Sequence, residues 1–362
     1  MKFAIACGGT GGHLFPGLAV AEVLLDKGHG VLLFVSEKQV DSRALDARPG
    51  MASEKLPSIG LPSLFSPAFV SFLRRMVASL RKTGAAYRRE RPDAVLGMGG
   101  FTSIAPLIVA RWRGIPAFLH ESNAIPGKAN RLAARFCKEV LLGFGVCAPF
   151  FPGRTRVTGT PIRRELAAGA PSREEARRIL GLDPARTTLL VMGGSQGAAG
   201  INVLMAQAAP FLAGAGIQII HLAGDRGVEA VQSAYDAAGV TAKVFPFCDR
   251  MHEVYPAADL AVSRSGAASL GELSWFGLPS VLVPFPYAAE DHQRLNAEIF
   301  VHAGAARMTL EQEATGENLA CLLLSLLESP ETLAAMSAAS RDQSPRDAAQ
   351  RVAAVLEEAK AP

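Results

Sequence analysis

The sequence contains no uninterrupted apolar run that approaches the roughly 20 residues needed to span a membrane as a helix. Its first residues, Met-Lys-Phe-Ala-Ile-Ala-Cys-Gly-Gly, reach glycine too early for the apolar segment of a secretory signal. We therefore expect a protein that is soluble or that at most lies on a membrane surface.

Cysteine is scarce and scattered, and the charge is close to balanced. No pair among the five cysteines has C-x-x-C spacing, which argues against a zinc site and against a disulfide framework. A reducing, cytosolic compartment fits this usage best. The formal net charge is only +4, which argues against nucleic acid as the main partner.

Short apolar runs alternate with longer Ala- and Leu-rich stretches along a chain of 362 residues, which exceeds what one hydrophobic core usually supports. This alternation predicts an α/β protein with two open, doubly wound parallel sheets. The first series of strands is expected at Phe3–Cys7, Val31–Val35, Ala94–Met98, Ala117–His120 and Glu139–Leu142. The second is expected at Thr188–Met192, Gln218–Leu222, Ala242–Phe245, Leu260–Ser263 and Ser280–Val283.

Helices are expected between these strands, at Gly17–Lys27, Phe69–Arg89, Thr102–Arg113, Ile201–Leu212, Gly227–Ala237, Ala267–Phe276 and Arg294–Ala303. A charged helix at Ser172–Leu180 precedes the second series, and the hinge is expected near residues 156–162. The helical tail is interrupted at Pro345, because proline breaks the hydrogen-bond ladder. The predicted parts are a first domain at 1–158, a second at 159–340 and a last helix at 341–362.

A glycine-rich loop, Gly8-Gly9-Thr10-Gly11-Gly12-His13, follows the first strand directly, and a helix is expected to open at about Phe15–Pro16. Glycines let the backbone approach an anion, and a helix N-terminus favours negative charge. Neither G-x-G-x-x-G nor the Walker pattern fits this loop. The loop is either a ligand-free turn or a binding loop on which His13 takes a proton near neutral pH.

A second glycine loop, Gly193-Gly194-Ser195-Gln196-Gly197-Ala198, stands at the start of the second series. Ser195 can donate to a phosphate through its hydroxyl and its backbone N–H. Two such loops, each opening its own Rossmann-like half, suggest a cleft between the domains with ligand groups from both sides.

Further polar residues follow later strands of the second series. Glu272 is expected in the first turns of a helix, facing a cleft rim, where it would accept both hydroxyls of a ribose or simply stabilise the helix dipole. The run from Asp291 to Asn296 suits sugar hydroxyls, although a solvated polar loop would look similar.

Taken together, these segments resemble the MurG family of bacteria, whose members transfer N-acetylglucosamine (GlcNAc) from UDP-GlcNAc to lipid I and so make lipid II for peptidoglycan. The matching stretches are Gly8–His13 (GGTGGH), His120–Gly127 (HESNAIPG), Gly159–Arg163 (GTPIR), Gly193–Ala198 (GGSQGA), Arg264–Glu272 (RSGAASLGE) and Asp291–Ala297 (DHQRLNA). The resemblance implies the GT-B fold, with two Rossmann-like domains, an interdomain cleft and a C-terminal helix that crosses back to the first domain.

The resemblance also implies which residues contact UDP-GlcNAc. In the first half these are Thr10, Gly11, Gly12, Asn123 and Arg163. In the second half, Ser195 would lie beside the diphosphate, the backbone at Cys248 would read the uracil edge, and Gln293, with His292 beside it, would read the sugar hydroxyls. The segment that would hold base, phosphate and ribose consists of Ala267, Ala268, Ser269, Leu270, Gly271 and Glu272.

The family inverts the configuration at C1 in one displacement, which requires a base for the acceptor hydroxyl. General-base assistance of this kind contributes about 100- to 10,000-fold. His13 is the first candidate for the base and Glu121 the second. The helix N-terminus after Ser195 and the cation of Arg163 would stabilise the departing diphosphate. No D-x-D motif marks a metal-dependent alternative, so we expect no metal and no other cofactor.

A basic and apolar stretch at residues 61–92 contains seven Arg and Lys residues against Glu90 alone. Aromatic and aliphatic residues, among them Leu64, Phe65 and Phe69, are interleaved with the cations, a pattern that suits an anionic membrane surface. Trp112 between two arginines adds an interfacial aromatic. The alternative is an amphipathic helix whose apolar face belongs to the core.

Functions outside this family compete with the transferase interpretation. A nicotinamide-dependent oxidoreductase is disfavoured because the dinucleotide fingerprint fails in both halves. A non-catalytic nucleotide-sugar-binding subunit, which would be a binding module rather than an enzyme, is a second rival. A glycolipid synthase that uses UDP-glucose or UDP-galactose, and a UDP-sugar epimerase, are compatible with the same pattern of loops.

Overall fold

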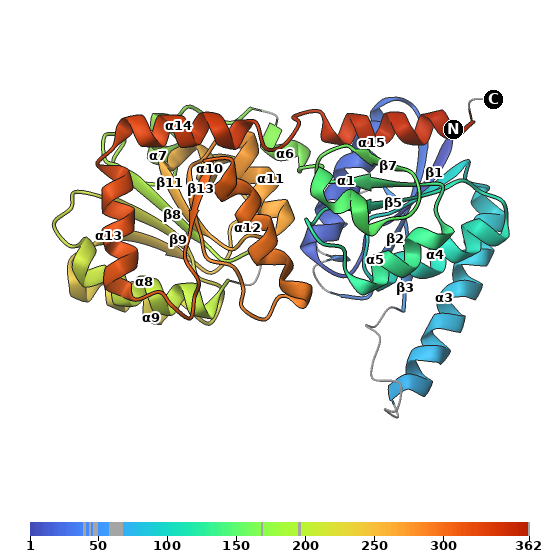
Figure 1. Ribbon diagram of the computed structural model, residues 1–362, viewed down its shortest axis with the longest axis horizontal. Helices are drawn as coiled ribbons and strands as arrows, with labels where there is room; N and C mark the ends of the chain where they lie inside the picture. The colour runs from blue at the N-terminus through green and yellow to red at the C-terminus, as the bar shows by residue number, and fades with distance from the viewer. Residues whose placement is uncertain are drawn as a thin grey trace. The chain divides into compact units, whose positions relative to one another are not determined.

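The computed structural model describes residues 1–38, 41–42, 45, 50–57, 68–167, 169–194 and 197–360. The chain forms two compact units, one of Met1–Arg163 together with Pro345–Pro362 and the other of Arg164–Ser344. Figure 1 shows that each unit is built on a twisted sheet with helices packed against it. The predicted α/β fold class is therefore confirmed.

Unit 1 contains a parallel sheet with the strand order β3-β2-β1-β4-β5-β6-β7. Its strands are β1 (Lys2–Ala6), β2 (Gly30–Ser36), β3 (Ala52–Leu56), β4 (Ala94–Gly97), β5 (Ala117–Glu121), β6 (Glu139–Leu142) and β7 (Thr155–Val157). Its helices are α1 (Gly11–Asp26), α3 (Ala68–Glu90), α4 (Phe101–Trp112), α5 (Lys128–Ala133) and α15 (Ala348–Glu357).

The alternation of side chains along β1 separates the two cores of unit 1. Phe3 and Ile5 pack on one face of the sheet with α1 and α15, whereas Ala4 and Ala6 pack on the other with α3, α4 and α5. The C-terminal helix α15 contributes fully buried side chains to the first core, and its Glu357 pairs with Lys27 beyond the end of α1. The last helix of the chain is thus an integral part of unit 1.

Unit 2 has a parallel sheet with the order β10-β9-β8-β11-β12-β13. Its strands are β8 (Thr188–Met192), β9 (Gln218–Leu222), β10 (Thr241–Phe245), β11 (Leu260–Ser263), β12 (Ser280–Leu282) and β13 (Ala306–Met308). Its helices are α6 (Arg164–Ala167), α7 (Arg173–Ile179), α8 (Ala199–Leu212), α9 (Val228–Ala238), α10 (Met251–Ala257), α11 (Ala267–Phe276), α12 (His292–His302), α13 (Gly316–Leu327) and α14 (Pro330–Arg341).

In unit 2, helices α8, α9 and α13 pack on one face of the sheet and share one core with β8 and β9.

Among the described residues, no single helix is long and apolar enough to cross a membrane. The pair α13 and α14 meets the criteria of length and composition only when the two are joined, and a bend of 92° separates them.

Candidate functional site

The strand order gives each sheet a point at which the chain changes direction. In unit 1 this point lies between β1 and β4, and in unit 2 between β8 and β11. Ligands of open α/β sheets bind outside the carboxyl ends of the strands at such points. Each of these four strands is followed by a turn that contains glycine, at 8–12, 99–100, 193–197 and 266. Two groups of candidate site residues, Thr10 to His13 and Ala267 to Glu272, lie at these turns or at the start of the helices that follow them.

The first glycine loop is held tightly against the neighbouring strand. A Cβ at Gly8 would overlap the backbone amide of Ser36, so only glycine fits there. Gly9 has φ +115°, a conformation that L side chains rarely adopt. Thr10 is the N-cap of α1, and the helix begins at Gly11. The prediction that it opens at about Phe15–Pro16 was therefore wrong.

The early start of α1 has a simple cause. The first N–H groups of a helix need no partner within it, so weak helix formers are tolerated in the first turn. Pro16 lies inside the helix and does not mark its beginning. Gly11, Gly12 and His13 consequently lie in the first turn, at the positive end of the helix dipole. Thr10 and Gly12 are exposed there.

The imidazole of His13 packs between two glycine turns. Its Nδ1 lies 3.1 Å from Thr10 Oγ1. A Cβ added at Gly99 would lie 3.1 Å from His13 Nε2, and one added at Gly100 would lie 3.2 Å from its Cε1. Because both glycines have positive φ and leave room for the ring, the turn after β4 fixes the place of the histidine.

A buried carboxylate that the sequence did not indicate anchors Gly9. Asp41 Oδ2 accepts hydrogen bonds from the backbone N–H of Gly9 (3.0 Å) and of Ser36 (2.7 Å) and from the Ser36 hydroxyl. On the other side, Lys38 Nζ donates to the Gly9 carbonyl oxygen at 2.7 Å. Both ends of the Gly9 residue are thereby held in place.

Glu121, at the end of β5, is buried and receives several donors. Its Oε1 accepts from the backbone N–H (2.9 Å) and the side-chain amide (3.0 Å) of Asn123, and its Oε2 accepts from Asn130 Nδ2 at 2.7 Å. Asn130 in turn accepts the Gly100 N–H through Oδ1. Burial raises the pKa of the Glu121 carboxyl, against the effect of these hydrogen bonds. The network joins the turn after β4 to the loop after β5.

Arg163 also lies beside the first glycine loop. Its guanidinium carbon is 4.8 Å from the centroid of the Phe15 ring, and Phe15 is in α1. In unit 1, therefore, the predicted site residues are on three segments: Thr10 with the first turn of α1, the end of β5 with the loop after it, and the end of the 159–163 segment.

In the second glycine loop, Gly193 and Gly197 are closely packed against their neighbours. A Cβ at Gly193 would overlap Ala198, and a Cβ at Gly197 would overlap the Ala223 carbonyl oxygen. Gly194 and Gly197 both have positive φ. The loop leads into α8, whose first turn is at Ala199. Ser195, the predicted diphosphate contact, lies outside the described residues.

The turn after β11 is joined to the loop after β12. Ser265 Oγ donates to the Gln293 carbonyl oxygen at 2.7 Å, and Asn296 Nδ2 donates to the Ser265 carbonyl oxygen at 3.0 Å. The Gln293 side chain accepts the Phe285 N–H through Oε1. Arg264 donates to the carbonyl oxygens of residues 283 and 284 and forms an ion pair with Glu311. The structure thus brings Gln293 next to the start of α11.

Helix α11 carries the predicted segment from Ala267 to Glu272. Glu272 is only 8% exposed, and its Oε2 accepts a hydrogen bond from Tyr255 Oη at 2.6 Å. This hydrogen bond ties the Glu272 carboxylate to α10, which carries Tyr255. Cys248 is half-buried in the loop before α10, and burial raises the pKa of its thiol.

Two residues directly before α12 are held in the left-handed region, although neither is glycine. Glu290 has φ +55° and Asp291 has φ +52°. Such conformations cost about 1–2 kcal/mol per residue and persist only where the surrounding structure holds the backbone in place. They place His292 and Gln293 in the first turn of α12. Sequence patterns gave no sign of this strain.

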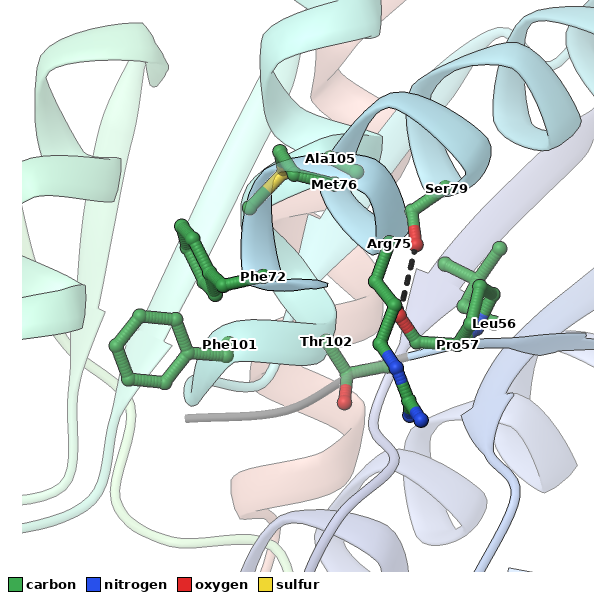
Figure 2. Close-up of a pocket in the computed structure, with 9 residues that line it drawn as sticks. All are labelled: Leu56, Pro57, Phe72, Arg75, Met76, Ser79, Phe101, Thr102 and Ala105. Carbon is green, nitrogen blue, oxygen red and sulfur yellow. Dashed lines mark hydrogen bonds between the residues drawn. The ribbon is translucent and has the colours of Figure 1, made fainter. Parts of the chain in front are cut away.

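A hollow lies beside the first glycine loop, between α3 and α4. Figure 2 shows Phe72, Met76 and Phe101 along one part of it, with the polar ends of Arg75 and Thr102 pointing the same way. A Cβ at Gly9 would lie 3.6 Å from Thr102 Oγ1, so the hollow borders the glycine loop.

Within the part of the chain that the structure describes, no group of three or more His, Cys, Asp or Glu residues is arranged to hold a metal ion.

The two Rossmann-like parallel sheets, with glycine turns at their switch points, give the chain a GT-B-like α/β fold. The model of the glycosyltransferase family 28 N-terminal domain matches residues 3–142, and that of its C-terminal domain matches residues 188–352. The chain belongs to glycosyltransferase family 28 and, within it, to the MurG family.

Individual relatives agree with this assignment. A protein of Pelobacter propionicus named UDP-N-acetylglucosamine--N-acetylmuramyl-(pentapeptide) pyrophosphoryl-undecaprenol N-acetylglucosamine transferase is 40% identical over 349 residues, covering 91% of this chain and 92% of that protein. The crystal structure of Acinetobacter baumannii MurG is similar with a TM-score of 0.78 and 28% identity, covering 99% of each chain. UDP-GlcNAc 2-epimerase of Neisseria meningitidis has a TM-score of 0.71 at 13% identity, covering 99% of this chain and 100% of that one, which shows the fold alone. The chain is thus a glycosyltransferase.

Proposed function

We propose that the protein transfers GlcNAc from UDP-GlcNAc to the C4 hydroxyl of N-acetylmuramic acid (MurNAc) in MurNAc-(pentapeptide)-pyrophosphoryl-undecaprenol, lipid I, to give lipid II for peptidoglycan. The observation that carries this proposal is the 40% identity to a transferase of that name across nearly the whole of both chains. The sequence identity to this transferase extends over both units, whereas the epimerase shares only the fold with this chain.

The donor would be held mainly by unit 2. The N-terminus of α8 and the glycines at 193–197 offer backbone N–H groups to a diphosphate, with Ser195 beside it. The backbone near Cys248 would read the uracil edge. The first turns of α11 and the Glu272 carboxylate would contact phosphate and ribose, and Gln293 the sugar hydroxyls. From unit 1 we assign donor contacts to Thr10, Gly11, Gly12, Asn123 and Arg163.

His13 is proposed as the general base. The acceptor hydroxyl attacks C1 of GlcNAc as its proton passes to the imidazole, the bond from C1 to the diphosphate oxygen breaks, and UDP leaves with the electron pair. The half-buried ring at the start of α1 has its position fixed by Thr10 and the turn at Gly99, as a base requires. Glu121 is less suited to this role, because Asn123 and Asn130 already donate to its oxygens.

The acceptor is a lipid, and α3 offers a surface for the membrane that contains it. Val70, Leu73 and Val77 are 45–56% exposed on this helix, and Arg74 and Arg75 are exposed between them. Figure 1 shows the N-terminal part of α3 projecting from the body of unit 1. The predicted residues Leu64 and Phe65 lie outside the described residues. We propose that this part of α3, with Trp112 of α4, rests on an anionic membrane at its cytoplasmic face.

The membrane contact is tested by sedimentation with vesicles that contain phosphatidylglycerol. Val70→Glu combined with Leu73→Glu should abolish binding to these vesicles, because both apolar contacts are lost and negative charge is added. Val203→Glu, at an equally exposed valine of unit 2, is the matched control and should bind like the wild type. Undiminished sedimentation of the double variant would refute this surface.

The transfer itself is tested with purified protein, a lipid I analogue and one of three labelled donors. UDP-GlcNAc should label the lipid, whereas UDP-glucose and UDP-galactose should do so poorly. Efficient labelling from a UDP-hexose in place of UDP-GlcNAc would overturn the donor assignment. A reduction of a nicotinamide cofactor would favour an oxidoreductase, and binding of UDP-GlcNAc without turnover would favour a binding subunit.

A further inference from the structure

A buried histidine of β9 lies behind the second glycine loop, and the transfer reaction does not use it directly. His221 is fully buried. Its Nδ1 lies 2.9 Å from the hydroxyl of Tyr235 in α9, and its Nε2 lies 3.0 Å from Oδ1 of Asn202 in α8. Asn202 belongs to the first turn of α8, which follows the glycine loop directly.

The direction of each hydrogen bond in this cluster follows from its far end. Asn202 Nδ2 donates to the Ala223 carbonyl oxygen at 2.8 Å, so Oδ1 of the same amide faces His221 as an acceptor. His221 therefore carries its proton on Nε2, and its Nδ1 accepts from the Tyr235 hydroxyl. Burial lowers the pKa of His221 to about 3, so the ring is neutral at physiological pH and this tautomer is the one present.

The Ala223 carbonyl, where the chain of hydrogen bonds ends, is in contact with the glycine loop. A Cβ at Gly197 would overlap this oxygen, and a Cβ at Gly227 would lie 2.6 Å from it. The N–H of Ala223 donates to the Phe245 carbonyl at 2.9 Å, at the end of β10. A single peptide segment thus touches the glycine loop on one side and, on the other, the strand that leads to Cys248.

We propose that Tyr235, His221 and Asn202 are positioning residues for the diphosphate of the donor. They hold the Ala223 carbonyl where it fixes Gly197, and with it the loop at the N-terminus of α8. A buried polar chain is costly unless every member is satisfied, and it then defines one arrangement of the groups that it joins. This inference rests on the proposed function, which assigns the glycine loop to UDP.

The sharpest test replaces Asn202 by aspartate, which has the same shape. Asn202→Asp keeps an acceptor for His221 but loses the donor to Ala223 and sets an oxygen against an oxygen. We expect UDP affinity to fall about tenfold, the loss expected from one such hydrogen bond. The KM for the donor should rise by a similar factor, while the KM for the lipid acceptor stays unchanged.

Two further variants complete the experiment. His221→Gln retains an N–H toward Asn202 and should keep UDP affinity within about threefold of the wild type, less than one full hydrogen bond. Gln232→Ala, on the exposed side of the same helix as Tyr235, is the matched control and should not change UDP affinity. Calorimetric titration with UDP and the two KM values are measured for each folded variant.

The outcomes separate this inference from the proposed function. Failure of the wild type to bind UDP would reject the proposed function itself. If the wild type binds UDP and Asn202→Asp binds it equally well, the positioning role is rejected. The role is also rejected if Asn202→Asp raises the KM for the donor and the KM for the lipid acceptor in parallel and His221→Gln does not restore them. If Asn202→Asp does not fold, Tyr235→Phe takes its place, because it removes only the hydroxyl at the far end of the hydrogen-bond chain. Its affinity for UDP should be severalfold weaker than that of the wild type, and an unchanged affinity would also reject the positioning role.

Discussion

Replacement of Glu121 by glutamine distinguishes a base from a residue that positions loops. The carboxylate accepts hydrogen bonds from the backbone and side chain of Asn123 and from the side chain of Asn130. An amide at this position has only one oxygen, so its NH2 group must face at least one of these donors. A buried donor without its acceptor costs about 1–3 kcal/mol. In a unit of this size each kcal/mol lowers Tm by about 2–4 °C.

Glu121→Gln and His13→Ala should differ far more in their effects on catalysis than in their effects on stability. Glu121→Gln, assayed as folded protein, should lose less than about tenfold in kcat, the effect of loops that have shifted slightly. His13→Ala should lose about 100- to 10,000-fold, the contribution of a general base. The assay is label transfer from UDP-GlcNAc to a lipid I analogue with both substrates saturating. A larger loss in Glu121→Gln than in His13→Ala would refute the assignment of the base.

The dependence of the free energy of unfolding on pH supplies a second comparison, between the wild type and Glu121→Gln. Because burial raises the pKa of Glu121, its contribution to stability is complete at low pH and is lost as the pH rises through that raised value. Glutamine does not titrate. The stability difference between wild type and Glu121→Gln should therefore narrow as the pH rises from 4 toward 7, and a difference that widens would contradict this reasoning.

Two further substitutions test the glycine loop and a buried histidine. Gly197→Ala should abolish UDP binding or folding of unit 2, because the new Cβ overlaps the Ala223 carbonyl. Gly239 also has a positive φ of +69°, but no atom lies near the position of a Cβ, so Gly239→Ala should lower the free energy of unfolding in denaturant by only about 1 kcal/mol. Burial lowers the pKa of His120 to about 4, so its contribution of about 3 kcal/mol is present above pH 6.5 and is lost as the pH falls toward 4. His120→Gln should flatten the pH dependence of unfolding over that range, and an unchanged slope would count against it.

The central strands were predictable because they are buried on both faces. Runs such as Phe3–Cys7 and Thr188–Met192 read as continuous apolar segments, which is the pattern of an inner parallel strand. The three strands that the sequence did not indicate, β3, β7 and β13, all lie at the edges of their sheets. Edge strands are short and carry polar residues, so their pattern resembles that of a loop.

The candidate site was predictable where local geometry requires glycine, and not where distant segments meet. The turns at Gly8–Gly12 and Gly193–Gly197 are evident from composition alone. Asp41, Asn130 and Tyr255 gave no such signal, because each acts through a contact with a residue far along the chain or on another element. The strain at residues 290–291 was equally hidden, since nothing about Glu or Asp requires a positive φ.

The identity of the product tests the proposed transfer most directly. Purified protein would be incubated with UDP-GlcNAc and a lipid I analogue, and the lipid and sugar products analysed by mass spectrometry and NMR. We predict UDP and a lipid that has gained one GlcNAc, β-linked to C4 of MurNAc. An unchanged lipid with UDP-GlcNAc converted at C2, as an epimerase of the same fold would do, or an α-linked product, would contradict the proposed function.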